Sequence, residues 1–320
     1  MTHGPGTGRL DRAEPLAEPA RVERGETMRT SPMSLVGVVI LAMLAGLGST
    51  VLAQDETPGV SVEVLSDHGV IPGEAIPEEA VRLVFARTSI EPGVTGEIGS
   101  AQPHEWASLE YVQQGSLTVA DNDRVAIWRA DGTTEDLSAG TTASADAGDL
   151  VLFYDGGAGR SLTNAGPETF VTYSVAVGDS EDPAEPPVLP SGVDWQLLVF
   201  DPLAPGTVDL WFTRPVAVAF ERLTFDPGSQ LVLGSDEAGL RRLLALEAGR
   251  LESGFAAPSE VDGALNDSVR FIAPDADILT SRSFADDTVY VIRNESDEPA
   301  VVMSATLTNV DGVTEAKPAD

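Results

Sequence analysis

The sequence predicts an all-β protein in which two tandem β-rich lobes follow an N-terminal signal segment. Three observations support this prediction. Gly (31) and Pro (22) are plentiful while aromatic residues make up only 6% of the chain, which favours short strands and tight turns over a helical bundle. Apolar residues recur at every second position near the end of each half, as in half-buried strands. Two long segments also match each other in order and spacing, which indicates a duplicated fold.

Residues 1–53 are predicted to be an N-terminal extension and a signal peptide. Arg29 precedes an uncharged apolar stretch that closes on Val51-Leu-Ala53, and a basic, apolar and small-x-small order is typical of an export signal. The pattern fits a true start at Met28. The alternative is an uncleaved anchor, because the charge-free span from Thr30 to Gln54 is long enough to cross a bilayer. In both cases the rest of the chain is expected outside the cytoplasm, secreted or tethered to the outer face of the membrane.

The mature chain is expected to contain two domains of ordinary size. Residues 178–193 are rich in Pro and acidic residues and lack apolar periodicity, which indicates a linker. This linker separates a first lobe at residues 58–177 from a second lobe at residues 194–312, each long enough for an independent core. Residues 313–320 are expected to form a disordered tail.

The charge of the mature chain excludes one class of partner. The first 53 residues hold five Arg and five acidic residues, so 14 basic and 46 acidic residues remain from the totals of 19 and 51, and the mature part carries the whole net charge of −32. Such a surface repels phosphate backbones, which excludes nucleic-acid binding. The chain contains no Cys, which excludes disulfides, thiol catalysis and iron–sulfur clusters. The composition is typical of an acidic, exported bacterial protein.

The local patterns indicate strands and turns in both lobes, with one conflict. Val171, Tyr173, Val175 and Val177 alternate with smaller or polar residues, as expected for a strand. Pro-Gly and Asp-Gly pairs mark turns. The exception is the Leu-rich segment near residues 240–251, where Leu residues fall at helical spacing.

An internal repeat resolves this conflict in favour of strands. Its matches place the Leu-rich segment opposite a segment of the first lobe with strand character, so we expect a strand, a turn and a second strand there. The matching pairs are Arg87–Gly93 with Arg222–Gly228, Leu109–Leu117 with Leu243–Leu251, and Thr163–Glu168 with Arg293–Glu298.

The order of motifs in the first lobe resembles the cupin superfamily. The resemblance covers most of this lobe and extends more weakly to the second through the repeat. It implies a double-stranded β-helix barrel in each lobe, with a pocket inside. The residues that carry it are Ile90-Glu-Pro-Gly93, His104, Glu110-Tyr-Val-Gln-Gln-Gly-Ser-Leu-Thr-Val119, Ala147-Gly-Asp-Leu-Val151 and Asn164-Ala-Gly-Pro-Glu168.

The same resemblance implies that the usual metal site has been lost. Metal-binding cupins place His-x-His, a Glu and a later His on facing strands. In this chain the four corresponding positions hold Gln102, His104, Ser108 and Arg160. These residue types are poor ligands for iron, manganese or zinc, and a guanidinium repels a cation. No metal and no cofactor are therefore predicted, and Gln102, His104, Ser108 and Arg160 are predicted to line a ligand pocket instead.

Three functions remain open from the sequence. The leading interpretation is a non-catalytic module that binds a small molecule or a partner, with the second lobe supplying stability. The first alternative is a metal-independent isomerase or epimerase, in which His104 is the general base and Tyr111 or Tyr154 the acid. The second is a metal-dependent oxidoreductase with a relaxed site. Membrane contact is expected only through an uncleaved N-terminal segment.

Overall fold

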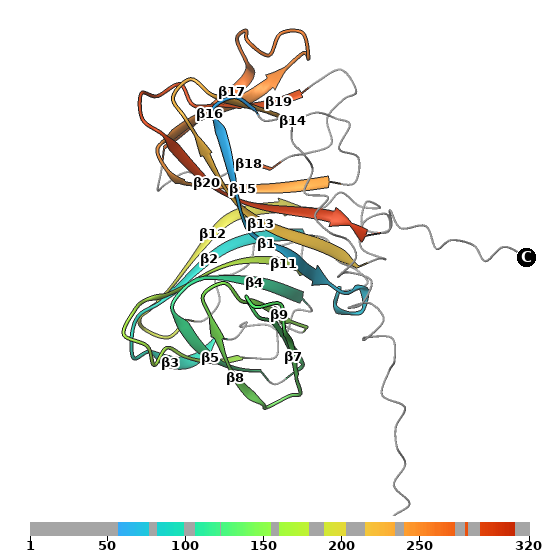
Figure 1. Ribbon diagram of the computed structural model, residues 1–320, viewed down its shortest axis with the longest axis vertical. Helices are drawn as coiled ribbons and strands as arrows, with labels where there is room; N and C mark the ends of the chain where they lie inside the picture. The colour runs from blue at the N-terminus through green and yellow to red at the C-terminus, as the bar shows by residue number, and fades with distance from the viewer. Residues whose placement is uncertain are drawn as a thin grey trace, which may run out of the picture. The chain divides into compact units, whose positions relative to one another are not determined.

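The chain forms strands along most of the length that the structure describes (Figure 1). The structure is a computed structural model, and within its described part the helical structure is one short 3₁₀ turn, Gly73–Ala75. This part contains no helix with the length and apolar character of a membrane span. The predicted signal, the tail at residues 313–320, Gln102 and His104 lie outside the described residues. The described ranges are 57–76, 82–98, 106–121, 123–154, 160–178, 189–202, 215–233, 240–272, 279–280 and 289–310.

Four antiparallel sheets build two tandem β-barrels, as the cupin resemblance implies, so the predicted fold class is confirmed. The first barrel contains a seven-stranded sheet, ordered β12-β2-β11-β4-β9-β6-β7, and a four-stranded sheet, ordered β3-β10-β5-β8. Its strands are β2 (Arg82–Ile90), β3 (Thr95–Ile98), β4 (Trp106–Gln114), β5 (Ser116–Asp121), β6 (Val125–Trp128), β7 (Thr134–Leu137), β8 (Thr142–Asp146), β9 (Leu150–Phe153), β10 (Arg160–Thr163), β11 (Phe170–Gly178) and β12 (Val193–Pro202).

The second barrel repeats this plan, with fewer strands among the residues that the structure describes. A five-stranded sheet is ordered β1-β13-β20-β15-β18, and a four-stranded sheet is ordered β14-β19-β16-β17. Its strands are β1 (Val60–Ile71), β13 (Val216–Phe225), β14 (Gln230–Leu233), β15 (Leu240–Ala248), β16 (Arg250–Ala256), β17 (Asn266–Ile272), β18 (Leu279–Thr280), β19 (Val289–Arg293) and β20 (Ala300–Asn309).

The Leu-rich segment is a strand, a turn and a strand, as the repeat predicted. β15 ends at Ala248 and β16 begins at Arg250, and Gly249 between them has a φ of 87°. That left-handed backbone is readily adopted by Gly because it has no Cβ. The equivalent turn between β4 and β5 uses Gly115, with a φ of 82°. Tertiary pairing therefore overrides the local preference of the Leu residues for helix.

The two barrels exchange their first strands. β1 precedes the first barrel in the chain but pairs with β13 of the second, from Val60 opposite Phe225 to Ile71 opposite Val216. β12 follows the predicted linker and pairs with β2 of the first barrel. The division at residues 178–193 was based on sequence composition and does not anticipate this exchange. Each half of the chain therefore completes the sheet of the other half.

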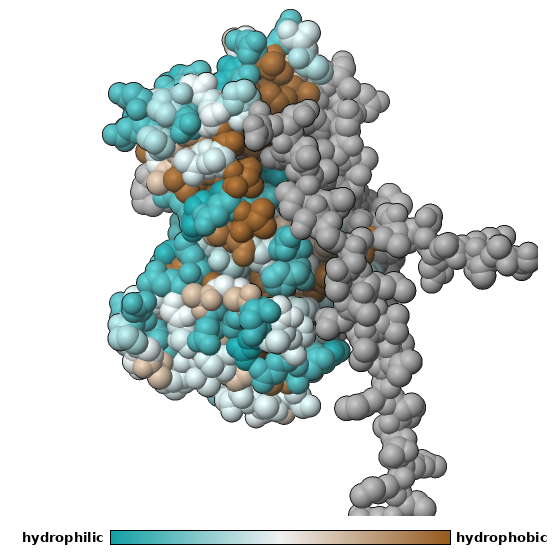
Figure 2. All heavy atoms as spheres, viewed as in Figure 1, coloured by the Kyte–Doolittle hydropathy of each residue, from teal (hydrophilic) through white to brown (hydrophobic). Residues whose placement is uncertain are grey.

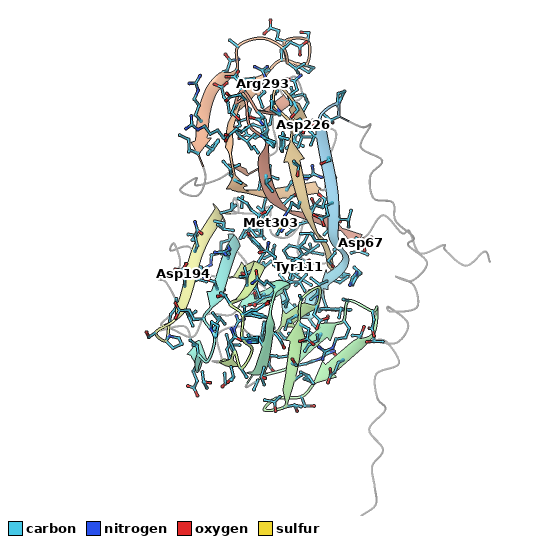
Figure 3. All side chains as sticks on the ribbon, turned by 60° about the vertical axis from the view of Figure 1, so that its left-hand side comes forward. Asp67, Tyr111, Asp194, Asp226, Arg293 and Met303 are labelled. Carbon is cyan, nitrogen blue, oxygen red and sulfur yellow. The ribbon has the colours of Figure 1, made fainter. Side chains whose placement is uncertain are left out.

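A shared apolar cluster joins the barrels. It combines buried residues of both, including Phe85, Tyr111 and Val175 from the first and Phe220 and Met303 from the second. The rings of Tyr111 and Phe220 are stacked with centroids 5.7 Å apart, and Figure 3 shows Tyr111 and Met303 on facing sheets where the barrels meet. On the face shown in Figure 2 the outer surface of the first barrel is largely hydrophilic, while hydrophobic residues gather toward this junction.

A polar contact at the edge of this junction also links the two barrels. The hydroxyl of Tyr173 in the first barrel donates a hydrogen bond to the carboxylate of Glu247 in the second. The other carboxylate oxygen of Glu247 accepts a hydrogen bond of 3.1 Å from Nε of Arg222. Burial raises the pKa of Tyr173 above its ordinary value. The tyrosine therefore remains protonated and keeps donating across the junction at neutral pH.

Candidate functional site

Two Asn residues in the repeated motifs, one of them part of the cupin resemblance, stabilise turns through side-chain hydrogen bonds. Nδ2 of Asn164 donates to the carbonyl oxygens of Ile90 (2.8 Å) and Glu168 (2.9 Å). Nδ2 of Asn294, its counterpart in the repeat, donates to the carbonyl oxygens of Phe225 and Glu298 at 2.9 and 2.8 Å. Both Asn residues are fully buried. Each Asn thus ties one strand end to its own turn, which explains why this residue recurs in both lobes.

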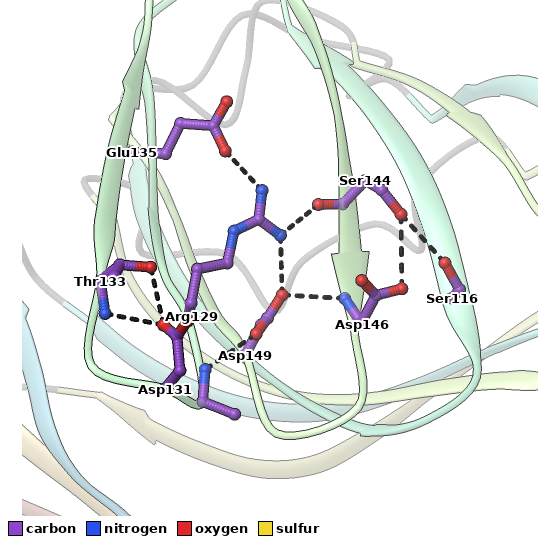
Figure 4. Close-up of polar contacts among 9 residues, drawn as sticks. Ser116, Arg129, Asp131, Thr133, Glu135, Ser144, Asp146 and Asp149 are labelled. Atoms are coloured by element: carbon purple, nitrogen blue, oxygen red, sulfur yellow. Dashed lines mark hydrogen bonds and ion pairs between the residues drawn. The ribbon is translucent and has the colours of Figure 1, made fainter.

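Asp149 of the Ala-Gly-Asp motif also has a structural role. Its carboxylate accepts hydrogen bonds from the backbone N–H groups of Ala130 and Asp146 and from the guanidinium of Arg129, which also pairs with Glu135 (Figure 4). These contacts fix the turn that precedes β9 against the end of β6. The acidic residues around Arg129 therefore hold the barrel wall in place.

Of the four residues predicted to line a pocket, the two that the structure describes, Ser108 and Arg160, fall on the inward face of β4 and on β10. Ala107, Leu109 and Tyr111 belong to the cluster between the barrels. Successive side chains of a strand point to opposite faces, so Ser108 and Glu110 face the barrel interior. Arg160 begins β10 in the facing sheet.

Ser108 and Arg160 converge on Glu110, a motif residue that the sequence interpretation did not place in the pocket. Nη1 of Arg160 forms an ion pair with Oε1 of Glu110, and Oγ of Ser108 donates to the same oxygen at 3.5 Å. The guanidinium carbon of Arg160 lies 4.0 Å from the centre of the Phe153 ring, in the geometry of a cation–π contact. The exposed fractions of the Arg160 and Glu110 side chains are 6% and 17%. The interior of the first barrel thus contains a buried, charge-compensated polar group.

The spacing from Ser108 was a sequence signal for Glu110. Glu110 lies two positions after Ser108 and therefore shares its strand face. A guanidinium inside a barrel also requires a nearby acid, because an uncompensated buried charge is strongly unfavourable. With 51 acidic residues in the chain, that requirement alone could not select Glu110.

The two tyrosines considered as acids lie away from this group. Tyr111 is on the opposite face of β4 from Glu110 and packs between the barrels, which differs from the expectation that it lies beside a pocket. Tyr154 follows β9, packs against the same cluster, and has the Arg124 guanidinium 4.4 Å from its ring centre. Burial raises the pKa of Tyr111, and it raises the pKa of Tyr154 to about 12. Neither phenol contacts Arg160, Glu110 or Ser108 through any hydrogen bond among the described residues.

The described residues of the first barrel do not fit a divalent metal. The two described positions that correspond to metal ligands hold the Ser108 hydroxyl and the Arg160 guanidinium, and Arg160 has no lone pair to offer an ion. Its positive charge also repels a cation in a poorly solvated barrel. Among the described residues no group of three or more His, Asp or Glu is arranged to hold an ion.

The second barrel carries different residues at the corresponding positions. The repeat aligns Ser108 with Arg242 and Arg160 with Tyr290. Arg242 is also buried and forms an ion pair with Glu221 at 3.4 Å. A guanidinium and a phenol are again unsuited to a divalent metal. Each barrel therefore contains an Arg–Glu pair, although the two pairs occupy different positions of the repeat.

Several solved structures of two-barrel proteins are similar to this chain at low sequence identity. AerE from Microcystis aeruginosa is 13% identical, with a TM-score of 0.35 over 79% of this chain and 95% of the other. Oxalate decarboxylase from Lactobacillus farciminis is 12% identical, with a TM-score of 0.36 over 79% and 85%. A mutant of the Bacillus subtilis oxalate decarboxylase is 13% identical, with a TM-score of 0.37 over 79% and 78%. Similarity at this level does not assign a function. No protein-family model and no curated protein sequence matches the chain.

Proposed function

We propose that this chain is an exported, bicupin-like protein that binds a small polar molecule in its first barrel and catalyses no reaction on it. The observation that carries the proposal is the convergence of Ser108 and Arg160 on Glu110 inside that barrel. This group offers hydrogen-bond donors and acceptors in a poorly solvated space, where polar recognition is strong and specific. Gln102 and His104 are proposed as further parts of the pocket wall.

The arrangement of charge supports binding over metal chemistry. Arg160 presents a planar set of N–H donors, and Phe153 and Glu110 hold the guanidinium in one orientation. A fixed guanidinium suits recognition of a ligand carboxylate or hydroxyl. An oxidoreductase with a relaxed metal site would have to place its ion beside this positive charge, which makes that alternative less favourable.

The fold-determining contacts support the same proposal. Asn164, Asn294 and Asp149 keep the hydrogen bonds that shape the barrels, while the described ligand positions of the resemblance hold Ser108 and Arg160. The barrel scaffold is thus kept, while Ser108 and Arg160 stand at two of the positions where the resemblance implies metal ligands. The metal-independent isomerase remains the second candidate, but Tyr111 packs between the barrels, on the face of β4 opposite to Ser108.

The test uses the protein beginning at Gln54 and a library of small carboxylates, sugars and sugar acids. Ligand-detected NMR should identify compounds that bind wild type and bind the Arg160→Met variant at least about tenfold more weakly, because a hydrogen bond to a charged group is lost. The bound compound should remain chemically unchanged after prolonged incubation. The proposal fails if binding is insensitive to Arg160→Met, if the compound is converted, or if the purified protein contains stoichiometric transition metal.

A further inference from the structure

A second group of buried polar side chains lies in the interior of the second barrel. Glu221 is on β13, Arg242 on β15, and Ser304 and Thr306 on β20, which runs between those two strands. In the register, Ser304 lies opposite Glu221 and Thr306 lies opposite Arg242. All four side chains are buried, with at most 9% of each residue exposed.

Strand alternation places these four residues inside the barrel. Their neighbours Phe220, Leu243, Met303 and Ala305 belong to the cluster between the barrels, so the intervening side chains point the other way. The residues two positions further along each strand are apolar and belong to the interior core of the second barrel: Leu223, Leu244 and Val302. The polar group therefore forms the layer next to this apolar core.

The charged members of the group compensate each other. Nε of Arg242 donates to the Thr306 hydroxyl at 3.1 Å, and Nη2 donates to Oε2 of Glu221 at 3.4 Å. The Thr306 hydroxyl lies 3.3 Å from the same Glu221 oxygen, to which it donates. The described part of the site is thus neutral, and it combines an acceptor carboxylate with a donor guanidinium.

Ser304 provides the independent indication of a ligand. The residue is fully buried, and its Oγ has no hydrogen-bond partner among the described residues. A buried hydroxyl without a partner is unfavourable, and such groups in folded proteins call for a missing water, ion or ligand. Ser304 shares a strand face with Thr306 and lies opposite Glu221, so a molecule that bonds to Ser304 would also contact the charged pair.

We propose that the second barrel is itself a binding site, built from Glu221, Arg242, Ser304 and Thr306, for an uncharged molecule with several hydroxyl groups, such as a neutral sugar or a sugar alcohol. Such hydroxyls can donate to the carboxylate and accept from the guanidinium and from Ser304. A ligand cation would be repelled by Arg242. A ligand anion would be repelled by Glu221, and a buried uncompensated charge is costly in either case.

This site goes beyond the one proposed for the first barrel. The repeat aligns Glu221, Arg242 and Thr306 with Ala86, Ser108 and Ala176, so the first barrel has no equivalent of this charged group. Ser304 aligns with Ser174, which is also buried. Ser174→Ala is therefore a matched control for Ser304→Ala.

The test measures binding of neutral hexoses, pentoses and sugar alcohols to the protein beginning at Gln54, by calorimetry and thermal shift. Each neutral compound is compared with its uronic acid or amino sugar. A neutral compound should bind wild type and Ser174→Ala equally, and bind Ser304→Ala about tenfold or more weakly. Without ligand, Ser304→Ala should melt no lower than wild type, because it removes an unpaired buried hydroxyl. The double variant Glu221→Leu with Arg242→Met should lose binding, while Arg160→Met should retain it.

Several results would overturn the proposal. They are preference for the charged sugars, loss of binding in Ser174→Ala but not in Ser304→Ala, no response to any neutral compound, or a lower melting temperature of Ser304→Ala without ligand. A crystal structure with only an ordered water on Ser304 Oγ after soaking with the compounds would also contradict it. Because Ser304→Ala changes one hydroxyl, the test remains decisive even if the double variant fails to fold. Binding that is lost only in the Arg160→Met variant would place the compound in the first barrel and not in the second.

Discussion

Replacing Glu110 by Gln should destabilise the protein far more than removing an acid from the surface. The change leaves the Arg160 guanidinium inside the first barrel with a neutral partner, and only 6% of the Arg160 side chain is exposed. Removing one partner of a buried ion pair costs about 3–5 kcal/mol. We expect about 3 kcal/mol, the lower end, because 17% of the Glu110 side chain reaches solvent and water relieves part of the penalty.

This free energy translates into a measurable change in melting temperature. For a folded unit of this size, 1 kcal/mol corresponds to about 2–4 °C, so Glu110→Gln should lower the melting temperature by about 6–12 °C. The assay is calorimetry together with urea unfolding followed by circular dichroism. Asp136→Asn is the control, because Asp136 pairs with Arg124 at 3.1 Å on the surface, with side chains 62% and 47% exposed. Such a pair contributes less than about 1 kcal/mol.

A double variant separates the ion pair from the packing around it. Glu110→Leu with Arg160→Met removes both charges while keeping similar volume, and a buried pair replaced in this way is often neutral for stability. The double variant should lie within about 1 kcal/mol of wild type, so it should be more stable than Glu110→Gln by about 2 kcal/mol or more. If Glu110→Gln costs no more than Asp136→Asn, the placement of this pair inside the barrel is wrong.

Three further predictions follow from the fold. Asn294→Ala should cost about 2–4 kcal/mol in urea unfolding, because the buried carbonyl oxygen of Phe225 and the partly buried one of Glu298 lose their donor; a change below about 1 kcal/mol would contradict the role of this turn. Burial raises the pKa of all four tyrosines, to about 12 for Tyr154 and Tyr290, above the unfolded value of about 10. This contribution to stability is therefore complete below about pH 10 and is lost as the pH rises toward 12. Phenolate absorbance should appear together with loss of circular dichroism, and phenolate at pH 10 in a native protein would refute the burial. Finally, a protease site placed within residues 179–188 should yield, after cleavage, two fragments that remain associated, because β1 and β12 each complete the other half's sheet; fragments that separate by gel filtration in native buffer would argue against the exchange.

The strand exchange changes how the second lobe should be tested. Deleting residues 194–312 would remove β12 from the first barrel and leave β1 without β13. Loss of folding in such a deletion would not show that the second lobe has only a stabilising role. Point variants inside each barrel, such as Arg160→Met and Ser304→Ala, address the two interiors separately.

Specific residues show how far sequence reasoning reached. The strand at Leu243–Leu251 was predicted correctly against local helix preference, because the repeat aligned it with a strand of the first lobe. Arg160 and Ser108 were selected through the cupin resemblance, and the structure brings both to one acid. Glu110 was missed because the chain offers too many acidic residues to choose a partner by charge alone.

By itself, the sequence determined that this is a duplicated β protein and where its main turns fall. These features depend on composition, periodicity and short motifs, all of which are local. Only the tertiary structure decided that the barrels exchange strands, that Tyr111 packs between them, and that Arg160 and Arg242 pair with Glu110 and Glu221. Those outcomes depend on which distant strands pair and in which register, and a shift of one residue would reverse the face of every side chain involved.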